Sequence, residues 1–165
     1  VSDLYAKGIS LWGTSKTFGM AGLRTGWLVS KNQEFLQKVI AFKDYLSICS
    51  SAPSEILSII ALRHIEDFRI PNLQKIQNNI ALFEAFAKQH NTIGTFISPR
   101  AGSTSFVPLN IECSSLEFSD DLVKKAGIMT VPAEMFGYKG KYIRVGFGRA
   151  GMPKTLEALS AYLNR

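Results

Sequence analysis

Cysteine and histidine are both scarce in this sequence. The 165 residues include two cysteines, Cys49 and Cys113, and two histidines, His64 and His90, and neither pair shows the close spacing of metal ligands. We therefore expect no metal site. Two distant cysteines allow one disulfide but no disulfide framework. The sequence thus favours a reduced compartment, and we expect a cytoplasmic protein.

Long apolar runs and basic clusters are also absent from the sequence. The most apolar stretch, Ile56–Leu62, is too short to cross a bilayer, and no signal-peptide pattern is present. The formal charge is +6, but the lysines and arginines are scattered, and their longest run is the pair Lys124 and Lys125. We therefore expect no membrane or nucleic-acid partner. A moderate positive charge suits small anions such as phosphates and carboxylates.

The stretch Ser15–Trp27 (SKTFGMAGLRTGW) is the most distinctive part of the sequence. It carries Lys16 and Arg24 among several glycines, which permit sharp turns and close approach to a ligand. Apolar runs on both sides predict buried strands over 9–15 and 24–30. An uncharged lysine amine can attack a carbonyl and form a Schiff base, and the planar fork of an arginine suits a phosphate. An amine beside a phosphate clamp is what a pyridoxal phosphate site requires.

This stretch resembles the lysine motif of the class I/II pyridoxal-phosphate aminotransferases, which have the aspartate aminotransferase fold (fold type I). The family pattern is Ser-Lys-x-Phe/Tyr-Gly-x-x-Gly-x-Arg-x-Gly-Trp/Tyr, and the matching residues are Ser15, Lys16, Phe18, Gly19, Gly22, Arg24, Gly26 and Trp27. The resemblance implies that Lys16 is the catalytic lysine that bonds to the cofactor and that Arg24 holds its phosphate. Many members carry a phosphate-binding serine where this chain has Gly13. The hydroxyls of Thr14 and Ser15 are therefore both candidates for that contact.

A further arginine lies in the apolar segment 141–147, where we expect a strand. Alternation places Tyr142, Arg144 and Gly146 on one face of that strand, and a lone arginine there is costly unless it meets an anion. One interpretation is an edge-strand arginine paired with a structural carboxylate. The other follows from the resemblance, because the same aminotransferases end with an apolar-Arg-apolar-x-Phe strand whose arginine binds the substrate α-carboxylate. Arg144 matches that position, and Arg149 is a weaker candidate.

The sequence as a whole indicates an α/β fold built from successive parts. By the resemblance, residues 1–66 form the tail of the large pyridoxal-phosphate-binding domain and its sheet. Residues 67–93 form a connecting helix, and residues 94–165 form a small C-terminal α+β domain. The chain would then be the C-terminal part of a fold type I enzyme.

Local signals predict the individual elements. Asn32 is a helix N-cap that precedes apolar residues at helical spacing, and a long amphipathic helix is expected from Pro71, which starts or kinks it, to about Asn91. Ser114 and Glu117 resemble a capping box at the start of a further helix. Short strands are expected over 95–98, 104–111, 128–131 and 141–147.

The resemblance implies the C-terminal portion of an enzyme that transfers an amino group between an amino acid and a 2-oxo acid as a homodimer. In that family several cofactor contacts precede the lysine, and this chain has few residues before Lys16. We therefore expect the isolated chain to be inactive, to expose apolar surface and to self-associate. The alternatives are a pyridoxal-phosphate-dependent lyase or cyclase on the same fold, an aminotransferase-like domain of a transcription regulator, and an interaction domain without a cofactor.

Overall fold

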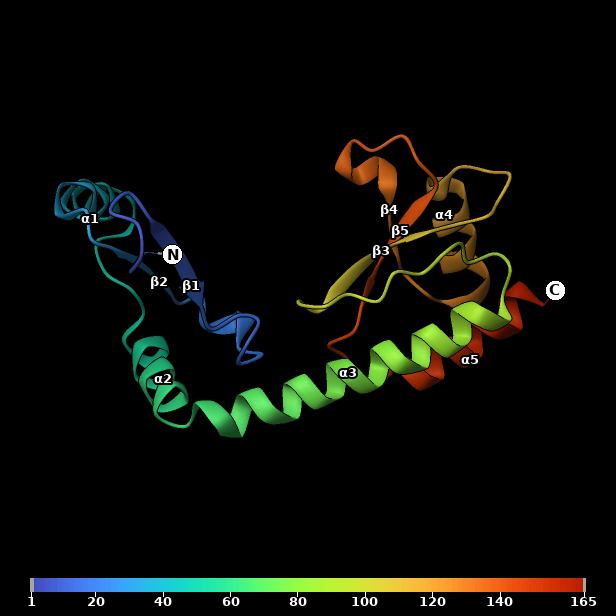
Figure 1. Cartoon of the computed structure of the whole chain (residues 1–165), viewed down its shortest axis with the longest axis horizontal. Coiled ribbons are helices and arrows are strands. Elements are labelled where there is room, and N and C mark those ends of the chain that lie inside the picture. The colour runs from blue at the N-terminus through green and yellow to red at the C-terminus, as the bar shows by residue number, and fades with distance from the viewer. Residues whose placement is uncertain (1, 165) are drawn as a thin grey trace. The chain divides into compact units, whose positions relative to one another are not determined.

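The computed structural model describes residues 2–164. The chain forms two compact units, Val1–Asn72 (unit 1) and Leu73–Arg165 (unit 2), and the division falls within helix α3 (Figure 1). The elements of unit 1 are β1 (Ile9–Gly13), η1 (Ala21–Leu23), β2 (Gly26–Ser30), α1 (Gln33–Ser47), α2 (Ala52–Arg63) and the start of α3 (Ile65–Gln89). Those of unit 2 are the rest of α3, β3 (Thr104–Pro108), α4 (Ser115–Ala126), β4 (Val131–Pro132), η2 (Ala133–Phe136), β5 (Tyr142–Gly146) and α5 (Met152–Leu163). Our division of the chain into three domains remains a prediction.

Unit 1 contains a two-stranded antiparallel sheet. Ile9 pairs with Ser30 at one end, and Gly13 pairs with Gly26 at the end where the connecting loop leaves. A Cβ atom at position 26 would lie 2.7 Å from the carbonyl oxygen of Trp12, so only glycine lets the two strands approach this closely. Both expected strands form, and each is shorter than expected at the end next to the loop. The expectation that they are buried is wrong: Leu11 is 78% and Trp12 58% exposed, because unit 1 has few other apolar side chains packed over them.

The helices of unit 1 bury few side chains. α1 begins after Asn32, whose side-chain oxygen accepts a hydrogen bond from the Phe35 N–H at 3.0 Å, as the capping signal predicts. No residue of α1 is buried, and Phe42 is exposed. Among the described residues of unit 1, only Phe18 and Ala61 are buried apolar side chains. The exposed apolar surface that we expect from the sequence is therefore present.

Helix α3 runs through Pro71 and is longer than the apolar spacing predicts. It begins at Ile65, ahead of the expected start, and ends at Gln89. Because proline has no N–H, the carbonyl of Asp67 lacks its usual partner within the helix. The helix thus ends close to the expected Asn91, and Pro71 lies inside it and not at its start.

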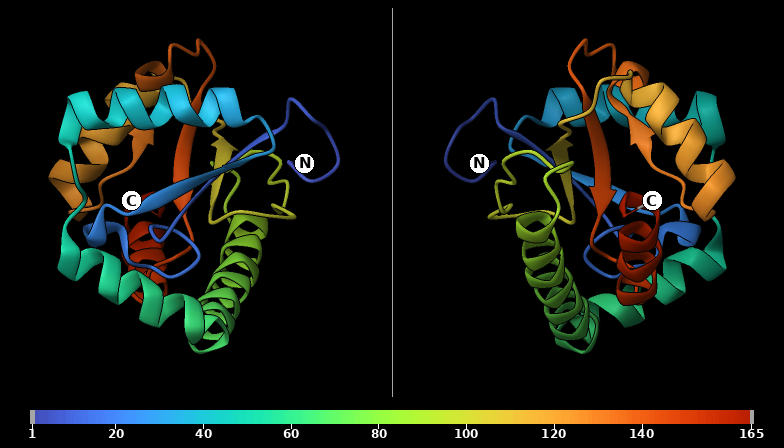
Figure 2. Two further views of the ribbon diagram at one scale, coloured as in Figure 1. Left: turned by 90° about the vertical axis from the view of Figure 1, so that its left-hand side faces the viewer. Right: turned by 90° about the vertical axis from the view of Figure 1, so that its right-hand side faces the viewer.

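Unit 2 is built on a three-stranded antiparallel sheet in the order β3-β5-β4. One face of this sheet packs against side chains from α3, α4 and α5, and in Figure 2 the green α3 and the red α5 lie on the same side of the strands. The buried members of this core are Phe83, Phe86, Ile93, Val107, Leu109, Phe118, Leu122, Ile143, Phe147, Met152 and Leu159. The helices do not cover the opposite face of the sheet, where Phe106 and Arg144 are exposed.

The expected strand over 95–98 is wrong. Those residues have no strand structure, and the nearest pairing is an isolated bridge between Ile93 and Leu109. Phe96 packs its ring against those of Phe83 and Phe147 instead, at centroid distances of 5.0 and 6.2 Å. Packing onto the core therefore takes the place of strand pairing in this segment. The strand expected over 128–131 is also mostly absent, because pairing with β5 begins only at Val131.

A buried asparagine joins α3 to the end of β5. The side-chain amide of Asn79 donates to the carbonyl oxygens of Phe147 at 2.8 Å and Arg149 at 2.7 Å. Two hydrogen bonds satisfy a polar group that would otherwise be costly to bury. Asn79 thus fixes the segment that follows the strand carrying Arg144.

Cys49 in unit 1 and Cys113 in unit 2 are both free and exposed, so the single disulfide that the sequence allows does not form. Within residues 2–164, no group of three or more His, Cys, Asp or Glu side chains could hold a metal ion. In the same range, no helix combines the length and the apolar character needed to cross a bilayer.

Candidate functional site

Thr14 closes the base of the loop between β1 and β2. Its side chain is fully buried, and its hydroxyl lies 3.4 Å from the carbonyl oxygen of Met20 and 3.3 Å from that of Thr25. Backbone hydrogen bonds join the same residues, because the Thr14 N–H donates to Thr25 and the Met20 N–H donates to Thr14, both at 3.1 Å. Thr14 therefore fixes the shape of the loop that carries Lys16.

A second anchor holds the far side of this loop against the start of α3. Phe18 is buried, and its ring lies 6.2 Å from that of Phe68. The side-chain amide of Asn72 donates to the carbonyl oxygen of Thr17 at 3.3 Å. Gly19, with a φ of 69°, makes the turn that follows. Contacts on both sides of Lys16 thus hold the backbone that presents it.

Lys16 and Arg24 are both exposed in this loop, and Ser15 is half-buried. Arg24 has a φ of 54°, in the left-handed region that residues other than glycine rarely adopt. Its guanidinium donates to the carbonyl oxygen of Ala21 at 3.3 Å. Among residues 2–164, neither cation forms an ion pair with a carboxylate. The loop therefore offers an amine and a guanidinium to a ligand from outside.

These side chains fit pyridoxal phosphate by their chemistry. The aldehyde of the cofactor needs a primary amine, and its phosphate needs a cation and further hydrogen-bond donors. Lys16, Arg24 and Ser15 supply these groups within one loop. Backbone strain at a residue other than glycine persists where the surroundings enforce it, and such residues cluster at ligand sites. The backbone of Arg24 thus supports a binding function for this loop.

Arg144 lies in unit 2, at the centre of the three-stranded sheet. Its strand, β5, is the middle one, and Phe106 of β3 and Val131 of β4 are its pairing partners. The guanidinium carbon lies 5.7 Å from the centre of the Phe136 ring. Arg144 makes no ion pair among the described residues. The interpretation of an edge-strand arginine with a structural carboxylate is therefore wrong.

The predicted site residues fall into two groups, one in each unit, and some of the residues that support them carry no clear signal in the sequence. Unit 1 brings Thr14, Ser15, Lys16 and Arg24 together in one loop, and unit 2 carries Arg144. Arg149 is exposed, and its carbonyl accepts the hydrogen bond from Asn79. Asn79 itself could have been found as a polar residue among the apolar positions of a long amphipathic helix.

Comparison with known proteins identifies relatives over nearly the whole chain. The family model "Aminotransferase class I and II" matches residues 4–163. Capreomycidine synthase of Streptomyces vinaceus is 28% identical over 152 residues, which are 90% of this chain and 38% of that protein. Aromatic-amino-acid aminotransferase 2 of Thermococcus litoralis is 27% identical over 164 residues, covering 91% of this chain and 39% of that protein.

A solved structure is similar to this chain in fold. The pyridoxal-phosphate-dependent aminotransferase of Streptococcus suis 89-1591 superposes with a TM-score of 0.91 at 28% identity, covering 99% of this chain and 43% of that one. The chain thus spans about two fifths of the length of these relatives. Its α/β fold is that of the C-terminal part of fold type I enzymes. The match to the family model over most of its length shows that this chain belongs to the class I and II aminotransferase family, whose cofactor is pyridoxal phosphate.

Proposed function

We propose that the complete protein containing this chain transfers an amino group between an amino acid and a 2-oxo acid. The observation that carries this proposal is the loop of unit 1, where Lys16 and Arg24 have no carboxylate partner among residues 2–164. When bound, pyridoxal phosphate supplies the electron sink for this reaction. Because the chain spans about two fifths of its relatives, the rest of the site comes from elsewhere in the complete protein.

Lys16 is the catalytic residue of this proposal. Its amine holds the cofactor covalently and, when free, moves a proton at the substrate α-carbon. The anchored backbone on both sides of Lys16 supports this function, since proton transfer requires a defined position of the amine. The exposure of Lys16 means that desolvation of its amine depends on groups outside this loop.

Arg24 is the proposed phosphate ligand, and its guanidinium can bind two phosphate oxygens at once. Of the two hydroxyls that the sequence offers, the geometry favours Ser15. The hydroxyl of Thr14 lies against two backbone carbonyls and is fully buried, so it supports the loop. Ser15 is half-buried beside Lys16, where a phosphate can reach it.

Arg144 is the proposed ligand of the substrate α-carboxylate. A guanidinium binds a carboxylate through two parallel hydrogen bonds, which fixes the orientation of the substrate. The lack of an ion pair at Arg144 within residues 2–164 supports this function. Two hydrogen bonds from the buried Asn79 hold the segment that follows its strand.

We also propose that the complete protein is a cytoplasmic homodimer and that the isolated 165-residue chain does not transaminate. Exposed apolar side chains on α1 and α2, such as Phe42, Leu46 and Ile56, support burial of this surface against further protein. The three-domain division into 1–66, 67–93 and 94–165 belongs to the same proposal.

A lyase or cyclase reaction on the same site is the second candidate. Capreomycidine synthase, one of the relatives at 28% identity, is named for a synthase reaction and not for amino-group transfer. Lys16, Arg24 and Arg144 would serve either reaction, since both need the same cofactor and the same carboxylate contact. The products distinguish them: amino-group transfer yields a new amino acid and a 2-oxo acid in equal amounts.

The proposal is tested by borohydride trapping of pyridoxal phosphate on the complete protein, followed by peptide mapping. We expect the label on Lys16. The variant Arg24→Gln loses a charged contact with the phosphate, so we expect it to raise the cofactor concentration needed for half-labelling by about tenfold or more. Lys31→Gln, a change at another exposed lysine of unit 1, is the matched control and should leave the labelling unchanged. Labelling spread over many lysines and unaffected by Lys16→Arg would contradict the proposal.

A further inference from the structure

Four aromatic side chains gather around Arg144 on the open face of the unit 2 sheet: Phe106, Phe136, Tyr138 and Tyr142, which we call the aromatic wall. Phe106 stacks on Tyr142 with ring centroids 5.0 Å apart and an angle of 11° between the planes. It also meets Phe136 and Tyr138 edge to face, at 5.7 and 5.8 Å. Phe106 thus lies at the centre of the wall.

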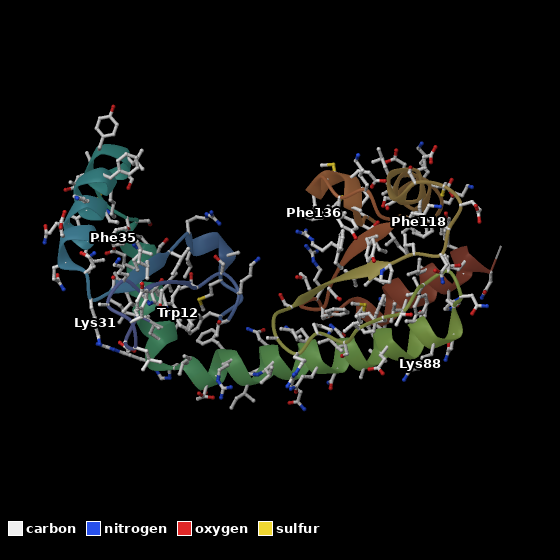
Figure 3. The ribbon with its side chains drawn as sticks, turned by 45° about the horizontal axis from the view of Figure 1, so that its top comes forward. Trp12, Lys31, Phe35, Lys88, Phe118 and Phe136 are labelled. Carbon is white, nitrogen blue, oxygen red and sulfur yellow. The ribbon has the colours of Figure 1, made fainter. Side chains whose placement is uncertain are left out.

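Strand geometry places the aromatic wall and Arg144 on the same face. Phe106 and Arg144 are paired across β3 and β5, and paired residues point to the same side of a sheet. Tyr142 lies two residues before Arg144 on β5, which gives it the same side. Phe136 comes from η2, where Figure 3 labels it, and its ring faces the Arg144 guanidinium. The wall is therefore the immediate surroundings of this cation.

Buried polar contacts fix the segment that carries the two tyrosines. Ser115 is fully buried, and its hydroxyl accepts a hydrogen bond from the Tyr142 N–H at 2.9 Å and donates to the carbonyl of Gly140 at 3.4 Å. The Ser115 N–H donates to the carboxylate of Glu134 in η2 at 3.1 Å. The N-terminal end of α4 thus holds both η2 and the start of β5.

Gly140 gives the tyrosine rings the space that they occupy. A Cβ atom at this position would lie 2.5 Å from Cε1 of Tyr138 and 2.9 Å from Cε2 of Tyr142. Any larger residue would displace these rings. The wall therefore depends on a specific local backbone and is more than a chance cluster of aromatic residues.

The wall leaves large apolar surfaces open beside a cation. Phe136 and Tyr138 are 52% and 50% exposed. A single exposed aromatic ring is ordinary on a protein surface, but a group of exposed rings next to a charged side chain is unusual. Among neighbouring cations, Lys141 donates to the carbonyls of Ile111 and Glu112, away from this group. A ligand bound to Arg144 would therefore contact the aromatic rings of the wall.

We propose that the aromatic wall selects substrates whose carboxylate is followed by an apolar or aromatic side chain, an inference that rests on the proposed function of Arg144. Ring surfaces gain free energy by contact with apolar groups, and aromatic pairs gain more. A second carboxylate in the same place would lose water without gaining a partner. The preferred substrates are therefore amino acids with apolar or aromatic side chains, not acidic ones.

The test measures how tightly three simple acids bind to the complete protein by isothermal titration calorimetry. Propionate carries the carboxylate alone, 3-phenylpropionate adds a ring, and succinate adds a second carboxylate. We expect 3-phenylpropionate to bind about tenfold tighter than propionate, because ring burial and ring–ring contact add to the carboxylate contact. Succinate should bind no tighter than propionate.

Variants of the wall locate this preference. Phe106→Ala should reduce the tenfold ratio to about twofold, because it weakens the binding of 3-phenylpropionate much more than that of propionate. Tyr138→Ala, in the exposed segment after η2, is the second variant and should lower the ratio in the same direction if Phe106→Ala does not fold. Val123→Ala, at an exposed position of α4, is the matched control and should leave the ratio unchanged.

Arg144→Lys separates this inference from the proposed function. If Arg144 binds the carboxylate, this variant weakens all three acids together. Equal affinities for propionate and 3-phenylpropionate, or tightest binding of succinate, would overturn the inference while the effect of Arg144→Lys remained. If Arg144→Lys changed none of the affinities, the proposed function of Arg144 would fail, and the inference would fail with it.

Discussion

Helix α1 of unit 1 and helix α4 of unit 2 both carry apolar residues at helical spacing, and only α4 finds a partner for them. α4 buries Phe118 and Leu122 against the core of unit 2, and Figure 3 labels Phe118 there. α1 buries none of its residues, and its Phe42 and Leu46 are exposed. Helical periodicity thus specifies which face of a helix is apolar but not what covers it.

The two units differ in the same way as these two helices. Unit 2 has a contiguous core that draws on helices and strands alike. Unit 1 buries only Phe18 and Ala61 among its described apolar side chains. Since burial of apolar surface is the main favourable contribution to folding, unit 2 has a source of stability within this chain that unit 1 largely lacks. This difference predicts unequal effects of matched substitutions in the two units.

Removing a core side chain from unit 2 should have the largest effect. Leu122 is fully buried, and Leu122→Ala should lower the free energy of unfolding of unit 2 by about 2–5 kcal/mol, because it removes packing and leaves a cavity. Leu11 of β1 is 78% exposed, and Leu11→Ala should change stability by less than about 0.5 kcal/mol. Urea unfolding followed by hydrogen exchange of the amides of each unit measures both. A comparable loss for Leu11→Ala would show that unit 1 has a core of its own.

The buried amide of Asn79 should come next. Asn79→Ala leaves the carbonyl groups of Phe147 and Arg149 without their hydrogen bonds, which should cost about 1–3 kcal/mol. Asn78→Ala, at an exposed position of the same helix, is the matched control and should cost almost nothing. Thermal unfolding of the two variants measures the difference. Equal stabilities would mean that these two hydrogen bonds contribute no net stability.

Equivalent helix caps should have unequal effects in the two units. Ser114 and Glu117 form a full capping box at α4, and hydrogen bonds from the Ser114 backbone and hydroxyl lower the pKa of Glu117. Ser114→Ala should lower the stability of unit 2 by about 1 kcal/mol. Asn32→Ala removes the cap of α1 and should loosen only that helix, because α1 buries nothing. Hydrogen exchange in both helices tests this, and a loss of protection throughout unit 1 on Asn32→Ala would argue for a cooperative unit 1.

The smallest effect concerns pH. A hydrogen bond from the Tyr162 hydroxyl, at 2.7 Å, and the neighbouring Lys125 lower the pKa of Asp121, which links α4 to α5. A lowered folded pKa stabilises unit 2 at pH values above about 3.9, the ordinary value for aspartate, and this contribution is lost as the pH falls through the folded value.

Tyr162→Phe should therefore destabilise unit 2 slightly at pH 7 and have a smaller effect near pH 2. Tyr45→Phe, at an exposed residue of unit 1, should have no effect at either pH. Unfolding midpoints at the two pH values provide the measurement. An effect of Tyr162→Phe that is the same at both pH values would assign it to packing and not to Asp121.

Local signals in the sequence predict most elements and the residues of the motif loop. The caps at Asn32 and Ser114, the strands on both sides of the loop and the alternation at Arg144 are all confirmed. They could be predicted because each depends on residues a few positions apart. Lys16 and Arg24 could be placed in one loop for the same reason, because they are close together in the sequence.

The features that the sequence does not predict depend on contacts between distant residues. Phe96 leaves the expected strand over 95–98 because its ring packs on Phe83 and Phe147. The aromatic wall forms because Ser115, far along the chain from Tyr142, fixes its backbone. The left-handed backbone of Arg24 and the burial of Thr14 also depend on how the loop closes on itself. No local spacing rule predicts these contacts.

The two free cysteines have a practical consequence for measuring how the units move. Each unit carries one exposed thiol, Cys49 in unit 1 and Cys113 in unit 2. In the 165-residue chain, a maleimide spin label at both positions would need no engineered residue, and it would report a distribution of inter-label distances in solution. The width of that distribution, compared between the 165-residue chain and the complete protein, measures how far unit 1 and unit 2 can move relative to each other.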